Sequence, residues 1–276
     1  MQKSILITGC SSGIGLDAAH GMRARGWRVF ASCRQQRDCD RLRAQGFESP
    51  RIDYTDTDSI TSGLSYVLEA TGGSLDALFN NGAHGLPGAV EDVPTDGLRH
   101  IFETNVFGWH ELTRQILPLM FAAGKGRIIH NSSVLGFAAM RARGAYNATK
   151  FALEGLTDTM RQEIAGTNID LILVQPGPIR TRIRQNAHIQ FKKWISWKDS
   201  RNPDFYTKGL IPRLSAENSE KDLFELMPDA VTRAVWHAAT ARRPKLRYRI
   251  TWATKIMAVA KRILSTRLMD RFASRF

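Results

Sequence analysis

The chain has 276 residues, enough for one large domain with a full hydrophobic core. Hydrophobic residues make up 43% and charged residues 24%, as in ordinary globular proteins, which argues against wholesale disorder. Lys and Arg number 39 against 26 Asp and Glu, so the net charge is +13, and this surplus suggests a polyanionic partner, either nucleic acid or an anionic membrane surface.

Strand and helix patterns alternate through the first two-thirds of the chain. Short apolar runs predict strands at 4–8, 28–32, 75–80, 126–131 and 170–174. Helices are predicted between them at 14–25, 56–70, 95–123 and 145–165, with a weaker helix at 37–45 and a short strand at 48–52. Such alternation implies parallel strands joined by right-handed crossovers. We therefore expect an α/β fold: a Rossmann-type, doubly wound parallel sheet with helices on both faces.

The alternation stops after Pro176. Residues 182–227 read as an irregular stretch, too long for a simple connection, and we interpret them as a substrate loop or lid. Pro228 begins a predicted helix to about residue 241, followed by a last strand at 244–250 and a terminal helix at 252–272. The expected organisation is one dinucleotide-binding and catalytic domain, 1–250, and a basic amphipathic helix within 251–276.

A glycine-rich turn, TGCSSGIG at 8–15, lies between the first strand and the first helix. Glycines permit a tight turn and close backbone approach, and the helix N-terminus offers N–H groups and a positive dipole to a pyrophosphate. The residues of the turn that we expect to bind a dinucleotide are Gly9, Ser11, Ser12, Gly13, Ile14 and Gly15.

The residues after the second strand bear on the choice of cofactor. NAD-binding proteins usually carry an acid there for the ribose 2′-hydroxyl, but this chain has Cys33 and Arg34, with no acid before Asp38. A guanidinium suits a 2′-phosphate. NADP is therefore favoured over NAD, with Arg34 as its ligand; Arg37 either assists or is solvated.

Tyr146 and Lys150 stand four residues apart in a predicted helix, so both side chains project from one face. Together with the glycine turn, this pair belongs to a series of motifs in fixed order: TGCSSGIG (8–15), Asp53 in IDYTD, FNNGA (79–83), TNVFG (104–108), NSSVLG (131–136), YNATK (146–150) and VQPGPIRT (174–181). On these motifs the chain resembles the short-chain dehydrogenases/reductases over roughly residues 3–250. It looks most like the branch with hydroxysteroid dehydrogenases, retinol dehydrogenases and bacterial aldehyde reductases.

The resemblance implies a catalytic set. Tyr146 would be the general acid/base, and the Lys150 ammonium would favour the phenolate and bind the nicotinamide ribose. Ser133 would orient the substrate carbonyl; its neighbour Ser132 competes, but the family spacing favours Ser133. Asn105 would hold a water that links Lys150 to a proton relay, the alternative being a polar residue that bends the helix.

The resemblance also implies further cofactor contacts. These are Asp53 at the adenine, Asn80 and Gly82 on the adenosine side, Pro176 and Gly177 beneath the nicotinamide, and Ile179 and Thr181 at its carboxamide, besides Tyr146 and Lys150. One departure is Gly82-Ala83, where the family commonly has Ala-Gly, so the contacts of that loop differ slightly.

The implied function is NADP(H)-dependent interconversion of a carbonyl and an alcohol by hydride transfer, without a metal. The segment after Thr181 carries seven large apolar or aromatic residues: Ile189, Phe191, Trp194, Ile195, Trp197, Phe205 and Tyr206. They either cover a lipophilic substrate or pack on the protein's own surface or a subunit interface. We expect a homo-oligomer, dimer or tetramer. A non-catalytic NADP-binding redox sensor is the alternative function.

Cysteine usage and the N-terminus bear on location. Cys10, Cys33 and Cys39 are odd in number and lack C-x-x-C spacing, which excludes a disulfide framework and argues against a structural zinc site. Free thiols fit a reducing compartment. The N-terminus lacks the features of a signal peptide, and no apolar run reaches the ~18 residues of a membrane span. We expect a cytoplasmic protein.

The positive charge is concentrated at the C-terminus. Residues 242–276 contain eleven Lys and Arg and one acid, a net charge of +10, which leaves +3 for the first 241 residues. The body therefore offers no electrostatic case for nucleic acid. The tail also carries apolar residues at near-helical spacing: Trp252, Ile256, Val259, Ala260, Ile263, Leu264, Leu268 and Phe272. It either packs on the domain or another subunit, lies on an anionic inner-membrane surface, or binds nucleic acid.

Overall fold

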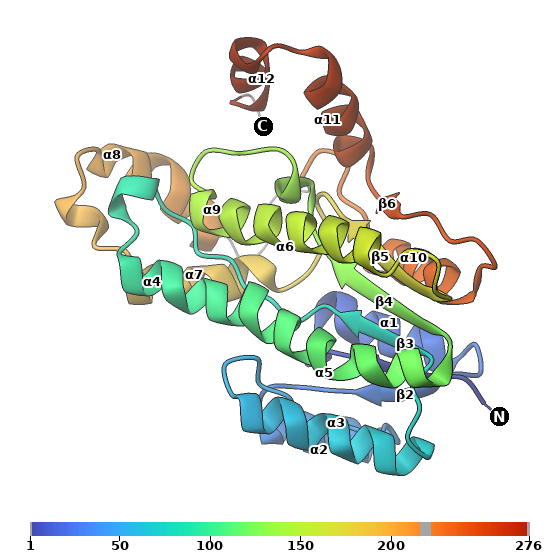
Figure 1. Cartoon of the computed structure of the whole chain (residues 1–276). Helices are drawn as coiled ribbons and strands as arrows, with labels where there is room; N and C mark the ends of the chain where they lie inside the picture. The colour runs from blue at the N-terminus through green and yellow to red at the C-terminus, as the bar shows by residue number, and fades with distance from the viewer. Residues whose placement is uncertain (1, 216–221, 275–276) are drawn as a thin grey trace.

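The computed structural model describes residues 2–215 and 222–274, and within them a six-stranded sheet has the order β2-β1-β3-β4-β5-β6 (Figure 1). Its strands are β1 (Ser4–Ile7), β2 (Arg28–Ala31), β3 (Ala77–Asn80), β4 (Gly126–Asn131), β5 (Ile169–Gln175) and β6 (Arg247–Arg249). All neighbouring strands are parallel. This confirms the predicted Rossmann-type sheet, and its near-continuous apolar strands suit burial on both faces.

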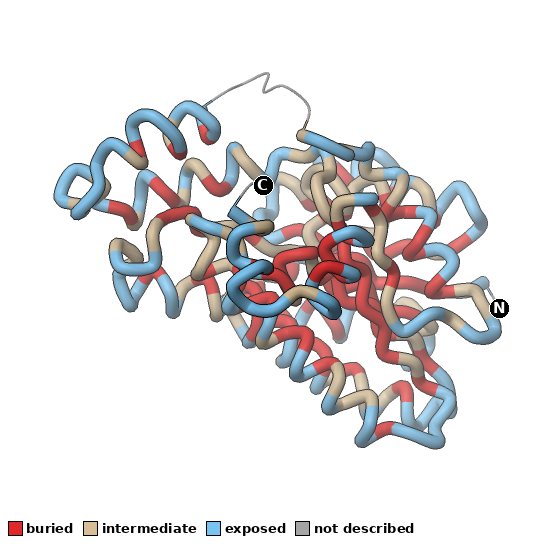
Figure 2. The backbone as a smooth tube through the Cα atoms, turned by 90° about the horizontal axis from the view of Figure 1, so that it is seen from above, coloured by how far each residue is buried: buried red, intermediate tan, exposed pale blue. Residues whose placement is uncertain are grey.

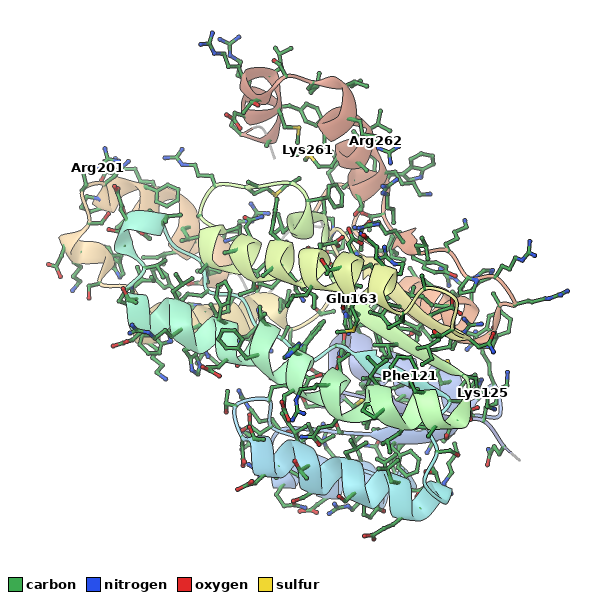
Figure 3. The ribbon with its side chains drawn as sticks, in the orientation of Figure 1. Phe121, Lys125, Glu163, Arg201, Lys261 and Arg262 are labelled. Atoms are coloured by element: carbon green, nitrogen blue, oxygen red, sulfur yellow. The ribbon has the colours of Figure 1, made fainter. Side chains whose placement is uncertain are left out.

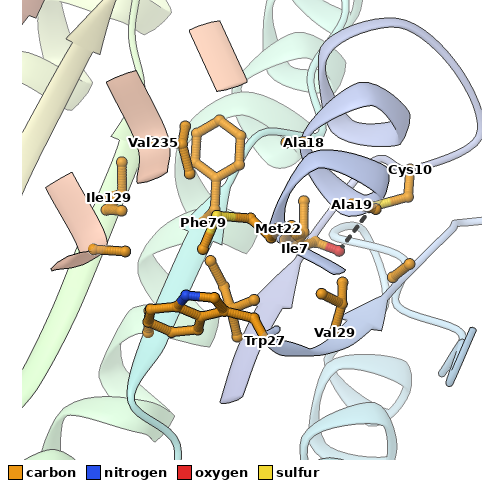
Figure 4. Close-up of a cluster of buried hydrophobic side chains, with 14 of the residues drawn as sticks. Ile7, Cys10, Ala18, Ala19, Met22, Trp27, Val29, Phe79, Ile129 and Val235 are labelled. Atoms are coloured by element: carbon orange, nitrogen blue, oxygen red, sulfur yellow. Dashed lines mark hydrogen bonds between the residues drawn. The ribbon is translucent and has the colours of Figure 1, made fainter. Parts of the chain in front are cut away.

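Helices cover both faces of the sheet (Figures 1 and 2). One face is covered by α1 (Gly13–Arg23), α2 (Gln36–Ala44) and α10 (Asp229–Thr240). The other is covered by α3 (Thr57–Thr71), α5 (Gly108–Ala123) and α6 (Gly144–Glu163). Figure 4 shows the first of these cores, where Met22, Phe79 and Val235 from α1, β3 and α10 meet. The two cores hold the carboxyl ends of the strands, where the candidate site lies, in fixed positions.

The helix predicted at 95–123 is continuous but not uniform. It consists of α4 (Thr95–Phe102), a π-helical turn (Glu103–Phe107) and α5. A π-helical turn widens the helix by one residue and often accompanies a functional site. Here it contains Asn105, one of the candidate catalytic residues.

Two predictions about secondary structure are wrong. The strand predicted at 48–52 is reduced to isolated bridges from Glu48 and Arg51, because Pro50 between them has no N–H to donate to a ladder. The stretch predicted as irregular is largely helical: α7 (Ile183–Trp194), α8 (Pro203–Phe205), a π-helical turn (Tyr206–Leu210) and α9 (Ile211–Ser215). The part of the predicted lid at 216–221 lies outside the described residues.

The terminal helix predicted at 252–272 is two helices, α11 (Trp252–Ile263) and α12 (Thr266–Ala273). Leu264 is extended, with ψ of 140°, and Ser265 precedes α12 with ψ of 161°, so the chain turns between them. The pair projects from the carboxyl-end side of the sheet (Figure 1). Among the described residues, no helix is long and apolar enough to cross a bilayer.

Candidate active site

The turn between β1 and α1 has the backbone of an anion site. Gly9 and Gly13 have φ of +69° and +59°, where side chains are strained. A Cβ on Gly9 would lie 2.6 Å from Gly82 Cα, and one on Gly15 would lie 2.4 Å from the Gly9 carbonyl oxygen. Ser12 makes no side-chain bond to the first turn of α1, which carries no acid. The N–H groups of that turn thus remain available to a phosphate.

The other residues of the turn fix its position. Ser11 accepts a hydrogen bond through its carbonyl from Arg41 Nη2 at 2.7 Å, which ties the turn to α2. Ile14 packs against the core beneath α1. The side chain of Thr181 lies over the turn, since a Cβ on Gly13 would be 3.1 Å from its Cβ and Cγ2. The first and last segments of the predicted cofactor site therefore meet.

The loop after β3 is bonded to the same turn. Thr8 Oγ1 accepts the N–H groups of Asn81 at 2.8 Å and Gly82 at 3.2 Å. Asn80 points into the fold, where its Oδ1 accepts from Tyr54 Oη at 2.7 Å and its Nδ2 donates to Thr113 Oγ1 at 3.1 Å. Asn80 therefore anchors the end of β3 within the fold, while the backbone of Gly82 packs closely against Gly9.

The adenosine end has a basic character. Arg34 is exposed, and no carboxylate within the described residues lies within ion-pair distance of it. Asp38 pairs instead with Arg41, at 3.3 Å. Asp53 is mostly buried and accepts the N–H and hydroxyl of Thr55 at 3.1 and 3.0 Å. Arg34 is thus available to a 2′-phosphate.

Lys150 is a buried cation one turn of α6 beyond Tyr146. Its Nζ donates to the Asn131 carbonyl at 2.8 Å and lies 4.3 Å from the Trp109 ring centre and 5.6 Å from that of Tyr146. Burial lowers the pKa of Lys150 to about 7, and the nearby Glu154 carboxylate opposes that shift. Burial raises the pKa of Tyr146 to about 12, which the proximity of Ser133 opposes. Tyr146 is therefore a phenol at neutral pH, the form that donates a proton.

The structure separates the two candidate serines. The Ser133 hydroxyl accepts the Leu135 N–H at 3.1 Å, and its proximity to Tyr146 lowers the pKa of that phenol, against the effect of burial. Ser132 Oγ faces Gly136, where an added Cβ would be 2.6 Å away. Ser133 is therefore the serine beside the candidate acid.

The Asn105 side chain is bonded to two neighbouring segments. Its Oδ1 accepts the His84 N–H at 3.1 Å, and its Nδ2 donates to the His84 carbonyl at 2.9 Å and to Thr149 Oγ1 at 3.3 Å. The side-chain amide is thus used to hold the loop after β3 against α6. These bonds position the loop, and the predicted role of Asn105 in holding a water stays a prediction.

The turn after β5 contacts three other segments of the site. Pro176 accepts the Val134 N–H through its carbonyl at 2.8 Å, and a Cβ on Gly177 would lie 2.2 Å from Thr251 Oγ1. Ile179 bridges to Leu226. The turn therefore joins the serine segment, the phosphate-binding turn and the start of α11.

Three residues at the site were not predicted as functional. Asn131 holds Lys150 through its carbonyl and donates from Nδ2 to Asn81 Oδ1 at 2.8 Å. Trp109 lies under the Lys150 ammonium. His84 is buried, and neither ring nitrogen has a hydrogen-bond partner in the described structure; burial, with His100 nearby, lowers its pKa to about 4. Only Asn131 carried a sequence signal, since it begins the NSSVLG motif.

These residues fit a dinucleotide. Ser32 Oγ and Asn131 Oδ1 are buried at the strand ends without a hydrogen-bond partner among the described residues, as expected of groups that a polar ligand completes. The close approach of Gly9 to Gly82 leaves main chain rather than side chains along the cleft. No cluster of metal-binding side chains occurs in the described part of the chain.

Comparison with known proteins agrees with this architecture. Residues 3–190 match the short chain dehydrogenase family. "Uncharacterized oxidoreductase YbbO" of Escherichia coli K12 is 38% identical over 271 residues, 98% of this chain and 94% of that protein. Retinol dehydrogenase 16 of Mus musculus is 29% identical, over 97% and 86%. A short-chain dehydrogenase structure from Streptomyces avermitilis superposes with a TM-score of 0.77 at 28% identity, over 94% and 92%.

The chain therefore is an oxidoreductase by class. It belongs to the short-chain dehydrogenase/reductase family, and the resemblance read from its motifs is confirmed.

Proposed function

We propose that the protein reduces a carbonyl, or oxidises the corresponding alcohol, on a lipophilic substrate with NADP(H), and that Tyr146 is the general acid/base. The observation that carries the proposal is the placement of the Tyr146 ring 5.6 Å from Nζ of the buried Lys150, one helical turn away, with Ser133 near enough to lower the pKa of Tyr146. The nicotinamide would supply or accept the hydride. Ser133 would hold the carbonyl oxygen, and Tyr146 would protonate it as charge develops.

Support for NADP comes from the adenosine end. Arg34 is exposed, and the nearest following acid, Asp38, is paired with Arg41. A free guanidinium can bind a 2′-phosphate through two parallel hydrogen bonds, whereas an NAD site usually has a carboxylate at this position. One relative, from Ornithobacterium rhinotracheale, is named "NADPH-dependent 3-dehydrocapnine reductase" and is 28% identical over 276 residues.

Support for a lipophilic substrate comes from the wall beside Tyr146. That ring packs against an apolar cluster that includes Ala187 and Phe191 of α7 and Leu214 of α9. Phe191 and Tyr206 are buried in the protein's own core, so they build the wall, while Ile189 remains 63% exposed. Relatives named as retinol dehydrogenases and as 17-beta-hydroxysteroid dehydrogenase type 6 agree with this class of substrate.

The test is NADPH and NADH oxidation with straight-chain aldehydes of increasing length and with ketones. We expect turnover that is faster with NADPH and rises with chain length. NADPH binding without turnover of any carbonyl would favour the redox-sensor alternative and overturn the proposal.

We also propose a homo-oligomer, in a reducing compartment such as the cytoplasm. Phe107, Phe151 and Leu156 on the outer faces of the α4–α5 helix and α6 are 52%, 42% and 44% exposed, an apolar area that a second copy could cover. The three cysteines are free and buried. Light scattering during gel filtration tests the assembly: Phe151→Arg/Leu156→Arg should reduce the measured mass to that of one chain, and an unchanged mass would contradict this face.

A further inference from the structure

Helix α11 turns an apolar stripe to solvent. Trp252, Ile256, Val259 and Ile263 follow one another at steps of four, three and four residues, so they lie on one face. Their exposed fractions are 64%, 40%, 58% and 74%. Leu268 of α12 adds a further side chain, 49% exposed. A surface helix ordinarily points such a stripe at the core.

The exposed stripe is not the face by which α11 packs on the domain, because a second apolar face of α11 already packs there. Met257 and Ala260 of α11 and Met269 of α12 are buried against Val134 and Leu135. The helix pair is therefore fixed to the domain by its inner face. Packing on the domain accounts for that face, and the outer stripe remains 40–74% exposed.

Basic side chains lie beside the outer stripe: by helical spacing Lys255 and Arg262 flank it, whereas Lys261 lies on the opposite side of α11. Lys255, Lys261, Arg262, Arg267 and Arg271 are all exposed, and none forms an ion pair with another described residue. Asp270 is the one acid between Trp252 and Ala273. Figure 3 places Lys261 and Arg262 on this helix pair, well away from Phe121 and Lys125 at the far end of α5. The surface is thus apolar along its centre and cationic at its edges.

We propose that α11 and α12 form a contact surface for an anionic lipid bilayer, with the stripe of α11 in the interface plane and Lys255 and Arg262 beside it among the headgroups. Apolar burial and headgroup attraction act together in such a helix. A second copy of the chain fits less well, since a two-fold contact through this face would bring the basic side chains of the two copies together. Anionic headgroups neutralise the same charges.

The position of the surface connects it to the candidate active site. α11 begins at Thr251, which contacts Gly177 of the nicotinamide turn, and its inner face covers the segment that follows Ser133. One helix diameter, ~10 Å, thus separates the bilayer surface from the serine segment. This inference rests on the proposed function: with the bilayer so close to the site, the substrates would be amphiphilic alcohols or carbonyl compounds that enter from the bilayer.

The test is flotation of the full-length protein with two sets of vesicles, phosphatidylcholine alone and phosphatidylcholine with phosphatidylglycerol. We expect binding to the anionic vesicles, weakened by salt. Trp252→Ser/Val259→Ser/Ile263→Ser removes only exposed side chains and should weaken binding at least about tenfold. Phe121→Ser/Leu246→Ser, also exposed and apolar, is the matched control and should bind as wild type does.

A second pair of variants separates local charge from net charge. Lys255→Glu/Arg262→Glu should weaken binding at least about tenfold, whereas Arg242→Glu/Arg243→Glu, the same change in net charge in the loop before β6, should have little effect. Equal binding to both vesicle types, or binding retained by the triple serine variant, overturns the proposal. A concentration-dependent dimer lost only in that variant also overturns it, in favour of a second copy.

Turnover of a short water-soluble aldehyde, measured without vesicles, tests the proposed enzyme activity separately from the proposed bilayer contact. The triple serine variant should retain wild-type turnover of that substrate while losing vesicle binding. Vesicle binding without any carbonyl turnover would leave the surface intact and remove its link to substrate delivery.

Discussion

Lys150 should make the empty enzyme less stable at neutral pH. Its pKa is lowered from 10.5 to about 7 by burial, so between these values the unfolded chain binds more protons than the folded one. Stability therefore rises with pH in this window. The Lys150 amine gains a proton when the chain unfolds. The lowered pKa therefore reduces the free energy of unfolding by about 4 kcal/mol at pH 7 and by about 2 kcal/mol at pH 9.

Lys150→Met keeps the length of the side chain and removes the titration. The variant also loses the hydrogen bond that the neutral amine donates to the Asn131 carbonyl, about 1 kcal/mol. We expect it to be about 3 kcal/mol more stable than wild type at pH 7 and about 1 kcal/mol more stable at pH 9.

The assay is urea unfolding followed by circular dichroism at pH 7, 8 and 9, without cofactor. Lys192→Met, at an exposed position on α7, is the control and should show no such change with pH. A difference between Lys150→Met and wild type that stays constant from pH 7 to 9 would refute the reasoning, since Lys150 would then keep an ordinary pKa in the folded chain.

Three further changes test separate parts of the site. Arg34→Ala should raise the Kd for NADPH at least about tenfold and leave that for NADH unchanged, as measured by ligand fluorescence. Ser133→Ala should lower kcat/KM about a hundredfold, whereas Ser132→Ala should lower it far less; the reverse order would reassign the carbonyl contact. Thr113→Val leaves the buried Asn80 amide without its acceptor and should cost about 1–3 kcal/mol of unfolding free energy; an unchanged urea midpoint would contradict this bond.

Much of the fold follows from local pattern. The strands and the glycine turn were predictable because apolar runs, glycines and helix starts lie within a few residues of one another. The strand predicted at 48–52 does not form, because Pro50 has no N–H to donate to a strand ladder. Helix α7 was missed because it has only two buried residues, Ala187 and Phe191, and the large apolar residue between them, Ile189, is exposed, so its apolar period is weak.

The site was predictable in its residues but not in its detailed contacts. The motifs brought Tyr146, Lys150 and Ser133 together, while the π-helical turn that turns the Asn105 amide toward His84 depends on packing between distant segments. The tail shows the same limit. Its apolar residues were listed as one set, but α11 divides them between a buried face and an exposed one, which only the position of the domain could decide.

The most direct test of the central claim is the single-turnover rate of NADPH oxidation for wild type and Tyr146→Phe, with enzyme in excess over an aldehyde that wild type reduces. The phenyl ring keeps the packing and removes the proton that Tyr146 donates. The account predicts a rate about 10²–10⁴ times lower, with the Kd for NADPH within about twofold of wild type. An unchanged rate would contradict it, because the proton would then come from another group.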